Sequence, residues 1–514
     1  MIDIIFHNAN IITLDTICPQ AQTIAIEKGR IARVERDVSI HKLIHSKTEV
    51  IDCKGKTILP GFIDSHCHLH AYAESLVTLN ISPMNNIHSI SDIQSSILKI
   101  YQQIASGSWI RAKGYNEFYL SEKRHPTRWD IDAVAPNIPV KLSHRSGHAH
   151  VLNSLAMNIV GITNETPEPP GGLIDRDLNT GEPTGILYEM GDFLSERIPS
   201  LERKDMQRGI RIANRKLLSL GITSIQDVSS RNNLEQWDNF NSWKREGSFK
   251  PRICMSLGME AFKKHNINEF PTYTDKGHLS INGVKIIVDE TTGLLYPSQS
   301  ELNEMVWEIH SSGSQAVLHV IEETAVESAC IAIEQALNSI PKLDHRHRLE
   351  HCSVCPESLS KRIASLGIMV VTQPAFVYYN GDRYLNTVPD HQLRNLYPIG
   401  TLMKYGVNVA ASSDFPITNP GPLIGISAAV SRNSDTGNSL LPEEGISHLE
   451  ALKMFTINAA KCSFEENDKG SIAPGKLADL VVLSHDPLVL PPDEIRDIKV
   501  EMTVINGDIV FNNS

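Results

Sequence analysis

Eight short apolar runs alternate with longer amphipathic segments, and this alternation constrains the fold more than any other feature. The runs lie at residues 61–66, 221–227, 252–258, 283–289, 315–321, 347–353, 369–375 and 407–414. Segments between them, such as 301–313 and 323–340, place apolar residues three and four apart, which is typical of a helix with one buried face. Strand–helix alternation predicts a parallel sheet, and eight parallel strands can close into a barrel. We therefore expect an α/β fold built on a (β/α)8 TIM barrel.

Both ends of the chain have a different pattern, with short strands separated by turn residues. The first 57 residues contain three such runs, and two more follow residue 469, where Asn506-Gly507 is typical of a tight hairpin turn. The simplest packing joins the two ends. We therefore expect a composite β-sandwich domain of residues 1–57 and 470–514, beside a barrel domain of residues 58–469.

A long insertion interrupts the barrel pattern after its first strand. It runs from residue 70 to about residue 215, with a strand-like stretch at 139–143 and a turn-rich stretch at 167–172. Loops that follow barrel strands lie at the carboxyl face, where the active sites of such barrels are built. We therefore expect the insertion to form a substrate pocket or lid.

Composition and charge exclude several classes of protein. The 48 Lys and Arg residues against 60 Asp and Glu residues give a net charge of −12, which argues against a nucleic-acid partner. The apolar runs are too short to span a membrane, the start lacks a secretory signal, and the eight scattered cysteines favour reduced thiols. We expect a cytoplasmic protein with a small-molecule substrate and, from the base rate among soluble enzymes, a homodimer.

Polar residues occur in the strand-like runs, where apolar residues would otherwise be expected. His66 and His68 alternate at the end of the first run, so their side chains share one face and can bind one divalent ion. Further polar residues fall in the fourth, fifth, sixth and eighth runs, at Lys285, His319, His351 and Asp414. A buried lysine is costly unless it is paired or neutralised. Together these positions predict a metal site at the carboxyl ends of the strands.

The order of these residues resembles that of the amidohydrolase superfamily of metal-dependent hydrolases, over nearly the whole chain. GKTILPGFIDSHCHLH is similar to the first-strand signature of that superfamily, and GSIAPGKLADLVVL is similar to its return to the sandwich. More narrowly, WIRAKGYN, RSGHAHVLNS, GEPTGILYE and HRLEH resemble the branch that includes N-substituted formamide deformylase.

The resemblance implies a set of ligands and a reaction. It implies that His66, His68 and Asp414 bind one metal, that His319 and His351 bind a second, and that a carboxylated Lys285 bridges the two. The expected cofactor is a divalent metal, zinc by preference, with one or two ions per chain. A metal-activated hydroxide would attack the carbonyl of an amide-type, non-peptide C–N bond, as in an N-substituted formamide or N-acyl amine. Asp414 would transfer the proton to the leaving amine.

The same resemblance marks five residues of the insertion as candidates for substrate contact. They are Tyr115, Asn116, His148, Asn153 and Glu189. The alternative for His148 and Asn153 is local hydrogen bonding, and for Glu189 it is a solvated helix end. Arg348 and Glu350 share a parity that differs from that of His351, so we expect them to form a salt bridge that supports the barrel.

Two alternative functions stay open. His319-x-x-Glu322 resembles the spacing of mononuclear deaminases of the same superfamily, although these generally lack the lysine of the fourth strand. The second alternative is a catalytically inactive scaffold protein. Loss of ligands would be its signature, whereas every expected ligand is present in this chain.

Overall fold

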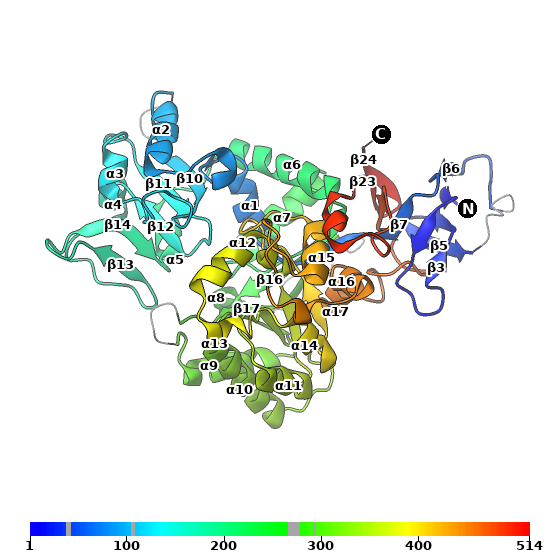
Figure 1. The fold of residues 1–514 in the computed structure, drawn as a ribbon. Coiled ribbons are helices and arrows are strands. Elements are labelled where there is room, and N and C mark those ends of the chain that lie inside the picture. The colour runs from blue at the N-terminus through cyan, green and yellow to red at the C-terminus, as the bar shows by residue number, and fades with distance from the viewer. Residues whose placement is uncertain (37–42, 104–107, 266–277, 291–294, 514) are drawn as a thin grey trace. The chain divides into compact units, whose positions relative to one another are not determined.

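The computed structural model describes residues 1–36, 43–103, 108–265, 278–290 and 295–513 (Figure 1). The described chain forms two compact units. Unit 1 takes its residues from Met1–Leu69, Ala213–Glu290 and Leu295–Ser514, and unit 2 takes its residues from His70–Ile212. No helix among the described residues is long and apolar enough to cross a membrane.

Unit 1 is built around an eight-stranded sheet in which every pairing of neighbours is parallel. Its strands follow chain order: β8 (Phe62–Cys67), β15 (Ile222–Asp227), β16 (Arg252–Gly258), β17 (Leu279–Ile287), β18 (Ala316–Val320), β19 (Arg348–His351), β20 (Met369–Thr372) and β21 (Val409–Ala411). β8, β16 and β19 are buried along their whole length, as expected for strands covered on both faces. All eight predicted runs are confirmed as strands.

The first and last strands meet through the residues that follow β21. The Asp414 amide donates to the carbonyl of His66 at 3.0 Å, and the His68 amide donates to the carbonyl of Phe415 at 2.9 Å. The Ser413 hydroxyl donates to the Asp64 carboxylate at 2.6 Å. These bonds bring the ends of the sheet together, and the predicted TIM barrel is confirmed.

Amphipathic helices alternate with the strands of unit 1. They include α6 (Arg203–Ser219), which begins in unit 2, and then α7 (Leu234–Arg245), α8 (Met259–Lys264), α9 (Gln299–Ser311), α10 (Glu323–Ser339), α11 (Glu357–Ser365), α12 (Pro374–Thr387), α13 (Asp390–Leu393), α14 (Ile399–Lys404), α15 (Pro422–Ser431), α16 (His448–Met454) and α17 (Ile457–Cys462). α9 begins at a capping box, in which the Ser298 hydroxyl and amide both donate to the Glu301 carboxylate. The helices predicted at 301–313 and 323–340 are thus α9 and α10.

The two chain ends form two further sheets of unit 1. One sheet has the order β5-β4-β1-β6 and the other β24-β23-β22-β7-β2-β3. Their strands are β1 (Ile4–His7), β2 (Asn10–Ile12), β3 (Gln20–Ala21), β4 (Thr23–Glu27), β5 (Arg30–Glu35), β6 (Glu49–Asp52), β7 (Thr57–Pro60), β22 (Leu480–Leu483), β23 (Val500–Ile505) and β24 (Asp508–Asn512). Residues from both ends, such as Phe6, Ile24, Leu480 and Val504, share one apolar core. The predicted β-sandwich is therefore present.

The predicted hairpin turn at Asn506-Gly507 is confirmed. Both residues have positive φ, 54° and 83°, and Ile505 pairs with Asp508 across the two-residue loop. Such turns favour Asn-Gly because a positive φ strains most other residues.

A buried ion pair ties a barrel strand to the sandwich. Nε of Arg252, on β16, lies 2.6 Å from Asp479 Oδ2, one residue before β22, and both side chains are buried. Asp479 also accepts the Asn506 amide at 2.8 Å, so one carboxylate joins the barrel to the carboxyl-terminal hairpin. Burying a charged pair is tolerated here because both partners are hydrogen-bonded.

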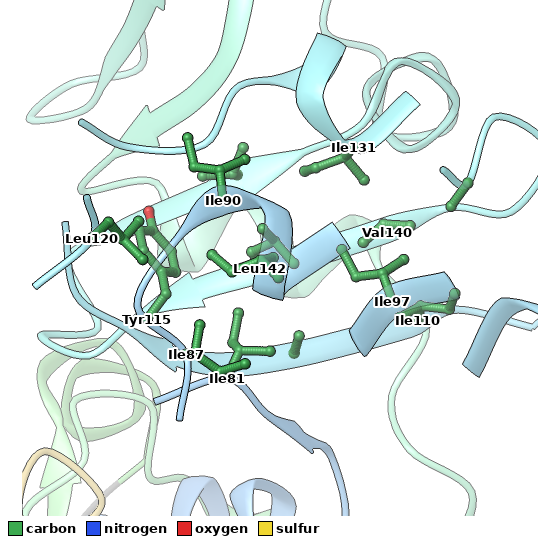
Figure 2. Packing of buried hydrophobic residues seen from close by; sticks show 14 of the residues in the cluster. Ile81, Ile87, Ile90, Ile97, Ile110, Tyr115, Leu120, Ile131, Val140 and Leu142 are labelled. Atoms are coloured by element: carbon green, nitrogen blue, oxygen red, sulfur yellow. The ribbon is translucent and has the colours of Figure 1, made fainter. Parts of the chain in front are cut away.

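Unit 2 consists of a six-stranded sheet and short helices. The sheet has the order β13-β14-β12-β11-β10-β9, with β9 (Leu79–Asn80), β10 (Ile110–Tyr115), β11 (Val140–His144), β12 (Ala149–Leu152), β13 (Leu173–Arg176) and β14 (Pro183–Tyr188). The helices are α2 (Ile90–Tyr101), α3 (Arg128–Asp132), α4 (Ser154–Val160) and α5 (Gly191–Arg197), after α1 (Leu69–Ser75), which begins in unit 1. Figure 2 shows Ile90 and Ile97 of α2 packed over Leu142 and Val140 of β11. The predicted strand at 139–143 is β11, while the domain bounds stay predictions.

Candidate metal centre

Four histidines and one aspartate lie close together at the carboxyl ends of barrel strands. His66 and His351 stand at the ends of β8 and β19, His319 is in β18, and Asp414 follows β21 by three residues. The ring centroid of His351 is 4.8 Å from that of His66 and 4.3 Å from that of His319. The ring of His68 lies 5.3 Å from that of His66. The structure thus brings together the predicted residues of strands one, five, six and eight.

Potential ligand atoms converge on one small volume. One side-chain nitrogen or oxygen from each of His66, His351 and Asp414 lies within 4.8 Å of the other two. Asp414 Oδ1 is 3.5 Å from His66 Nε2 and 3.2 Å from His68 Nε2. Nitrogen and carboxylate oxygen ligands in such an arrangement are those that divalent transition metals accept.

The neighbours of His66 and His351 determine which ring nitrogen carries the proton. His66 Nδ1 contacts the Glu350 carboxylate, and His351 Nδ1 lies 2.8 Å from Gln373 Oε1. The Gln373 amide is oriented because its Nε2 donates to Ser412 Oγ at 2.9 Å. Since both partners are acceptors, Nδ1 must donate, and Nε2 of each neutral ring keeps its lone pair.

Burial keeps both rings neutral. Burial and the nearby cationic groups hold the pKa of His66 well below its ordinary value, and burial lowers the pKa of His351 to about 4. At neutral pH the two Nε2 lone pairs are therefore free of protons. Lone pairs that face a carboxylate oxygen repel it unless a cation lies between them.

Buried polar atoms that lack hydrogen-bond partners support the presence of such a cation. Among the described residues, His351 Nε2, Asp414 Oδ1 and Lys285 Nζ are buried without any hydrogen-bond partner. Buried polar atoms in native proteins are almost always paired, so three orphans at one place need an explanation. The donor set, with imidazole nitrogens and a carboxylate, fits a divalent metal.

Lys285 is buried near the carboxyl end of β17. Only 3% of the residue is exposed, and burial lowers the pKa of its amine to about 8. A neutral amine is therefore accessible near physiological pH. The predicted lysine of the fourth strand thus lies inside the barrel, where an unmodified ammonium group would be costly.

Two residues of the centre have left-handed backbone conformations. φ is +69° at His351 and +56° at Asp414. Non-glycine residues in this region cost on the order of 1–3 kcal/mol and cluster at functional sites, where the surrounding structure imposes them. Both outliers here are candidate ligands.

Three supporting residues had not been identified from the sequence as contacts of the centre. Glu350 contacts His66, Gln373 contacts His351, and Ser229 Oγ lies 2.9 Å from His68 Nδ1. The predicted ion pair between Arg348 and Glu350 is confirmed, with Nε 2.7 Å from Oε1. A charged residue inside a buried strand run was the signal for Glu350. No comparable signal marked Ser229 or Gln373, which lie just beyond the ends of strands.

Asn153, a predicted substrate contact in unit 2, is fully buried and fully hydrogen-bonded. Its Oδ1 accepts the amides of Val140 and Ala156, and its Nδ2 donates to the carbonyls of Ala135 and Ile138. It is the N-cap of α4. No part of the amide is left for a substrate, so the structure favours the local structural role.

Tyr115 and Asn116 are also buried within unit 2. Tyr115 belongs to the apolar cluster of Figure 2, and its hydroxyl lies 2.9 Å from His125 Nδ1. Asn116 accepts the amide of Phe118 at 3.1 Å with its own side chain. These contacts explain both residues by packing and turn formation, so the geometry favours structure over substrate contact.

His148 and Glu189 form a pair in unit 2. His148 Nδ1 is 2.9 Å from Glu189 Oε1, and the Glu189 amide donates to the His148 carbonyl at 2.9 Å. Glu189 has φ of +53° and lies between β14 and α5, directly before Met190, the N-cap of that helix. The pair remains a predicted substrate-contacting element.

Comparison with known proteins gives matches along almost the whole chain. The amidohydrolase family pattern matches residues 49–511. The chain is 30% identical to N-substituted formamide deformylase of Arthrobacter pascens, covering 100% of this chain and 99% of the relative. It is 28% identical to the putative amidohydrolase YtcJ of Bacillus subtilis (strain 168), covering 91% of each chain. A metal-dependent hydrolase from Pyrococcus furiosus has a similar structure, with a TM-score of 0.72 at 26% identity over 94% of this chain and 99% of that one.

Proposed function

The chain belongs to the amidohydrolase family, and on that premise we propose that it is a metal-dependent hydrolase of an amide-type, non-peptide C–N bond in a small molecule. One observation carries the proposal. Buried atoms of His351, Asp414 and Lys285 have no hydrogen-bond partner among the described residues, and they belong to residues that the family resemblance assigns to metal binding.

We assign one divalent ion, zinc by preference, to His66, His68 and Asp414, and a second to His319 and His351. Lys285 would bridge the two as its carbamate, formed when the neutral amine adds to carbon dioxide and releases one proton. The carbamate replaces a buried ammonium group by an anion that two cations can share. When bound, the metal supplies Lewis acidity, which polarises the substrate carbonyl and lowers the pKa of a water molecule.

Asp414 is the residue we assign to proton transfer. Its Oδ1 is buried and faces the imidazole nitrogens, so it can accept the proton of the attacking water and deliver it to the leaving amine nitrogen. The backbone bond from the Asp414 amide to His66 holds the carboxylate in this position. Its burial keeps bulk water from competing for the proton.

The substrate class is best tested with small amides, formamides first, because one relative is named an N-substituted formamide deformylase. Protein loaded with zinc should hydrolyse at least one of a set of N-substituted formamides, N-acyl amines, ureas and cyclic amidines. Asp414→Asn should bind metal and lose about 10²–10⁴-fold in kcat. Full activity in Asp414→Asn would exclude the assigned proton transfer, and no hydrolysis of any compound would count against the proposed class.

The mononuclear deaminase makes opposite predictions about Lys285. The deaminase alternative rests on Glu322, the residue in the His319-x-x-Glu322 spacing. Its half-buried carboxylate accepts a hydrogen bond from Gln392 at 3.2 Å, and Glu322 is the N-cap of α10. The hydrolase should contain about two metals per chain and a carbamate signal in ¹³C NMR after exposure to ¹³C-bicarbonate. About one metal, no carbamate and release of ammonia from aminated substrates would instead favour the deaminase.

A further inference from the structure

The candidate histidine ligands differ in the group that contacts Nδ1, the ring nitrogen that is not assigned to the metal. Nδ1 of His66 faces a carboxylate, Nδ1 of His351 faces a neutral amide, and Nδ1 of His68 faces a hydroxyl. A carboxylate behind a ligating imidazole fixes the ring and raises the basicity of the other nitrogen more than a neutral acceptor does. The three histidines are therefore not equivalent as ligands.

The carboxylate behind His66 is itself held rigidly. Glu350 is fully buried, and its second oxygen lies 2.7 Å from Nε of Arg348, which is also buried. Arg348 in turn donates to Oε1 of Gln226, whose Nε2 donates to the carbonyl of Ala459 at 2.8 Å. The ion pair with Arg348 therefore holds the Glu350 carboxylate in the orientation in which its other oxygen contacts Nδ1 of His66.

We propose that Arg348 and Glu350 are positioning residues that make His66 the dominant anchor of the metal centre. Glu350 selects the tautomer in which Nε2 of His66 is the ligand atom, and Arg348 orients the Glu350 carboxylate toward His66. The contact of His66 with Glu350 consequently strengthens the binding of its ion more than the contact of His351 with Gln373 strengthens the binding of the other ion. This inference rests on the proposed metal sites, and it names the residues that make the affinity of one site higher than that of the other.

Metal affinity tests this ranking directly. Glu350→Gln keeps the shape of the side chain and removes its charge, and it should weaken one bound ion by about 10–100-fold, measured by competition with a chromogenic chelator. Gln373→Met removes only a neutral acceptor behind His351 and should weaken one ion by about 2–10-fold. An equal loss in the two variants, or no loss in Glu350→Gln, would overturn the ranking.

Asp479→Asn provides a matched control for lost stability. It removes the charge of another buried carboxylate paired with an arginine in the same unit, Arg252, at the junction with the sandwich. It should lower the unfolding temperature and leave both metal affinities within about twofold. A loss of affinity equal to that of Glu350→Gln would show that the effect reports stability alone.

A second measurement does not depend on any variant of Glu350 or Arg348. In metal-free protein, ¹⁵N NMR of labelled histidine should show His66 with its proton on Nδ1, assigned by comparison with His66→Gln. A proton on Nε2 would contradict the proposal even if Glu350→Gln fails to fold. Absence of metal binding in the unmodified protein would instead refute the proposed function, so the two failures are distinguishable.

Discussion

Two groups of histidines lie at opposite ends of the same barrel strands, and only one of them is a candidate metal centre. His351 is the last residue of β19, whereas His347 immediately precedes its first residue. Around His347 are His345 and His310, the latter on α9. The ring centroids within this second group are as close as 4.7 Å, comparable with those at the carboxyl end.

The difference lies in the hydrogen bonds. His347 Nδ1 accepts the Ala316 amide at 2.9 Å, and its Nε2 lies 2.8 Å from His310 Nδ1. His310 Nε2 reaches the Ile340 carbonyl at 2.7 Å. His345 accepts the His347 amide with one nitrogen and reaches the Leu366 carbonyl with the other. All six ring nitrogens thus have partners, so this group is structural, whereas the carboxyl-end group leaves ligand atoms unpaired.

Metal removal should give the largest contrast between the two ends. Dialysis against a chelator should abolish hydrolysis and lower the free energy of unfolding, by about 2.7 kcal/mol if the free metal had been at 100 times its dissociation constant. Restoring zinc should recover both quantities. Activity that survives complete removal, checked by elemental analysis, would refute the assignment of the carboxyl-end group.

Replacing one histidine at each end should separate the two roles. His351→Asn should lose metal and activity, because it deletes a ligand atom. His347→Phe should retain the metal content and cost about 2–5 kcal/mol of stability, since it leaves the Ala316 amide and His310 Nδ1 buried without a partner. Elemental analysis and urea unfolding measure the two effects. If folded His347→Phe lost its metal, the assignment of a purely structural role to the His347 group would be wrong.

The structural group should make the protein sensitive to mild acid. Burial holds the pKa of His347 well below 6.5 and also lowers that of His345. Below about pH 6.5 the unfolded chain therefore binds protons that the folded chain does not. The free energy of unfolding then decreases as the pH is lowered, by up to about 1.4 kcal/mol per pH unit for each histidine. His347→Asn should show a shallower fall between pH 6.5 and 5 in urea unfolding. If the free energy of unfolding had the same pH dependence in His347→Asn, the pKa of His347 would not differ between the folded and the unfolded chain.

The smallest expected effect concerns the hydroxyl behind His68. Ser229→Ala removes one neutral hydrogen bond in a half-exposed position, and it should weaken metal binding by about 2–10-fold without loss of stability. Chelator competition measures this change beside that of Glu350→Gln. A loss larger than in Glu350→Gln would reverse the order of the supporting contacts.

Much of the fold and of the candidate centre was predictable from local pattern. The period of apolar residues predicts strands and helices because side chains of a strand alternate and those of a helix recur every three to four residues. Polar residues at strand ends predicted His66, His319, His351 and Asp414 because parallel strands bring their carboxyl ends to one edge. The motifs that marked Asn153 and Tyr115 do not reveal whether a polar group already has a partner, as both side chains do in the structure. Their contact with a substrate stays a prediction.

The sequence by itself determined the order of strands and helices, the hairpin at Asn506-Gly507 and the residue types available as ligands, since these depend on neighbours in the chain. Only the tertiary structure decided which hydrogen-bond partners the ring nitrogens of the described histidines find. His347 and His351 are four residues apart in one strand run, yet their partners come from α9 and from the end of β20. Hydrogen-bond satisfaction depends on contacts between distant segments, and those exist only after folding.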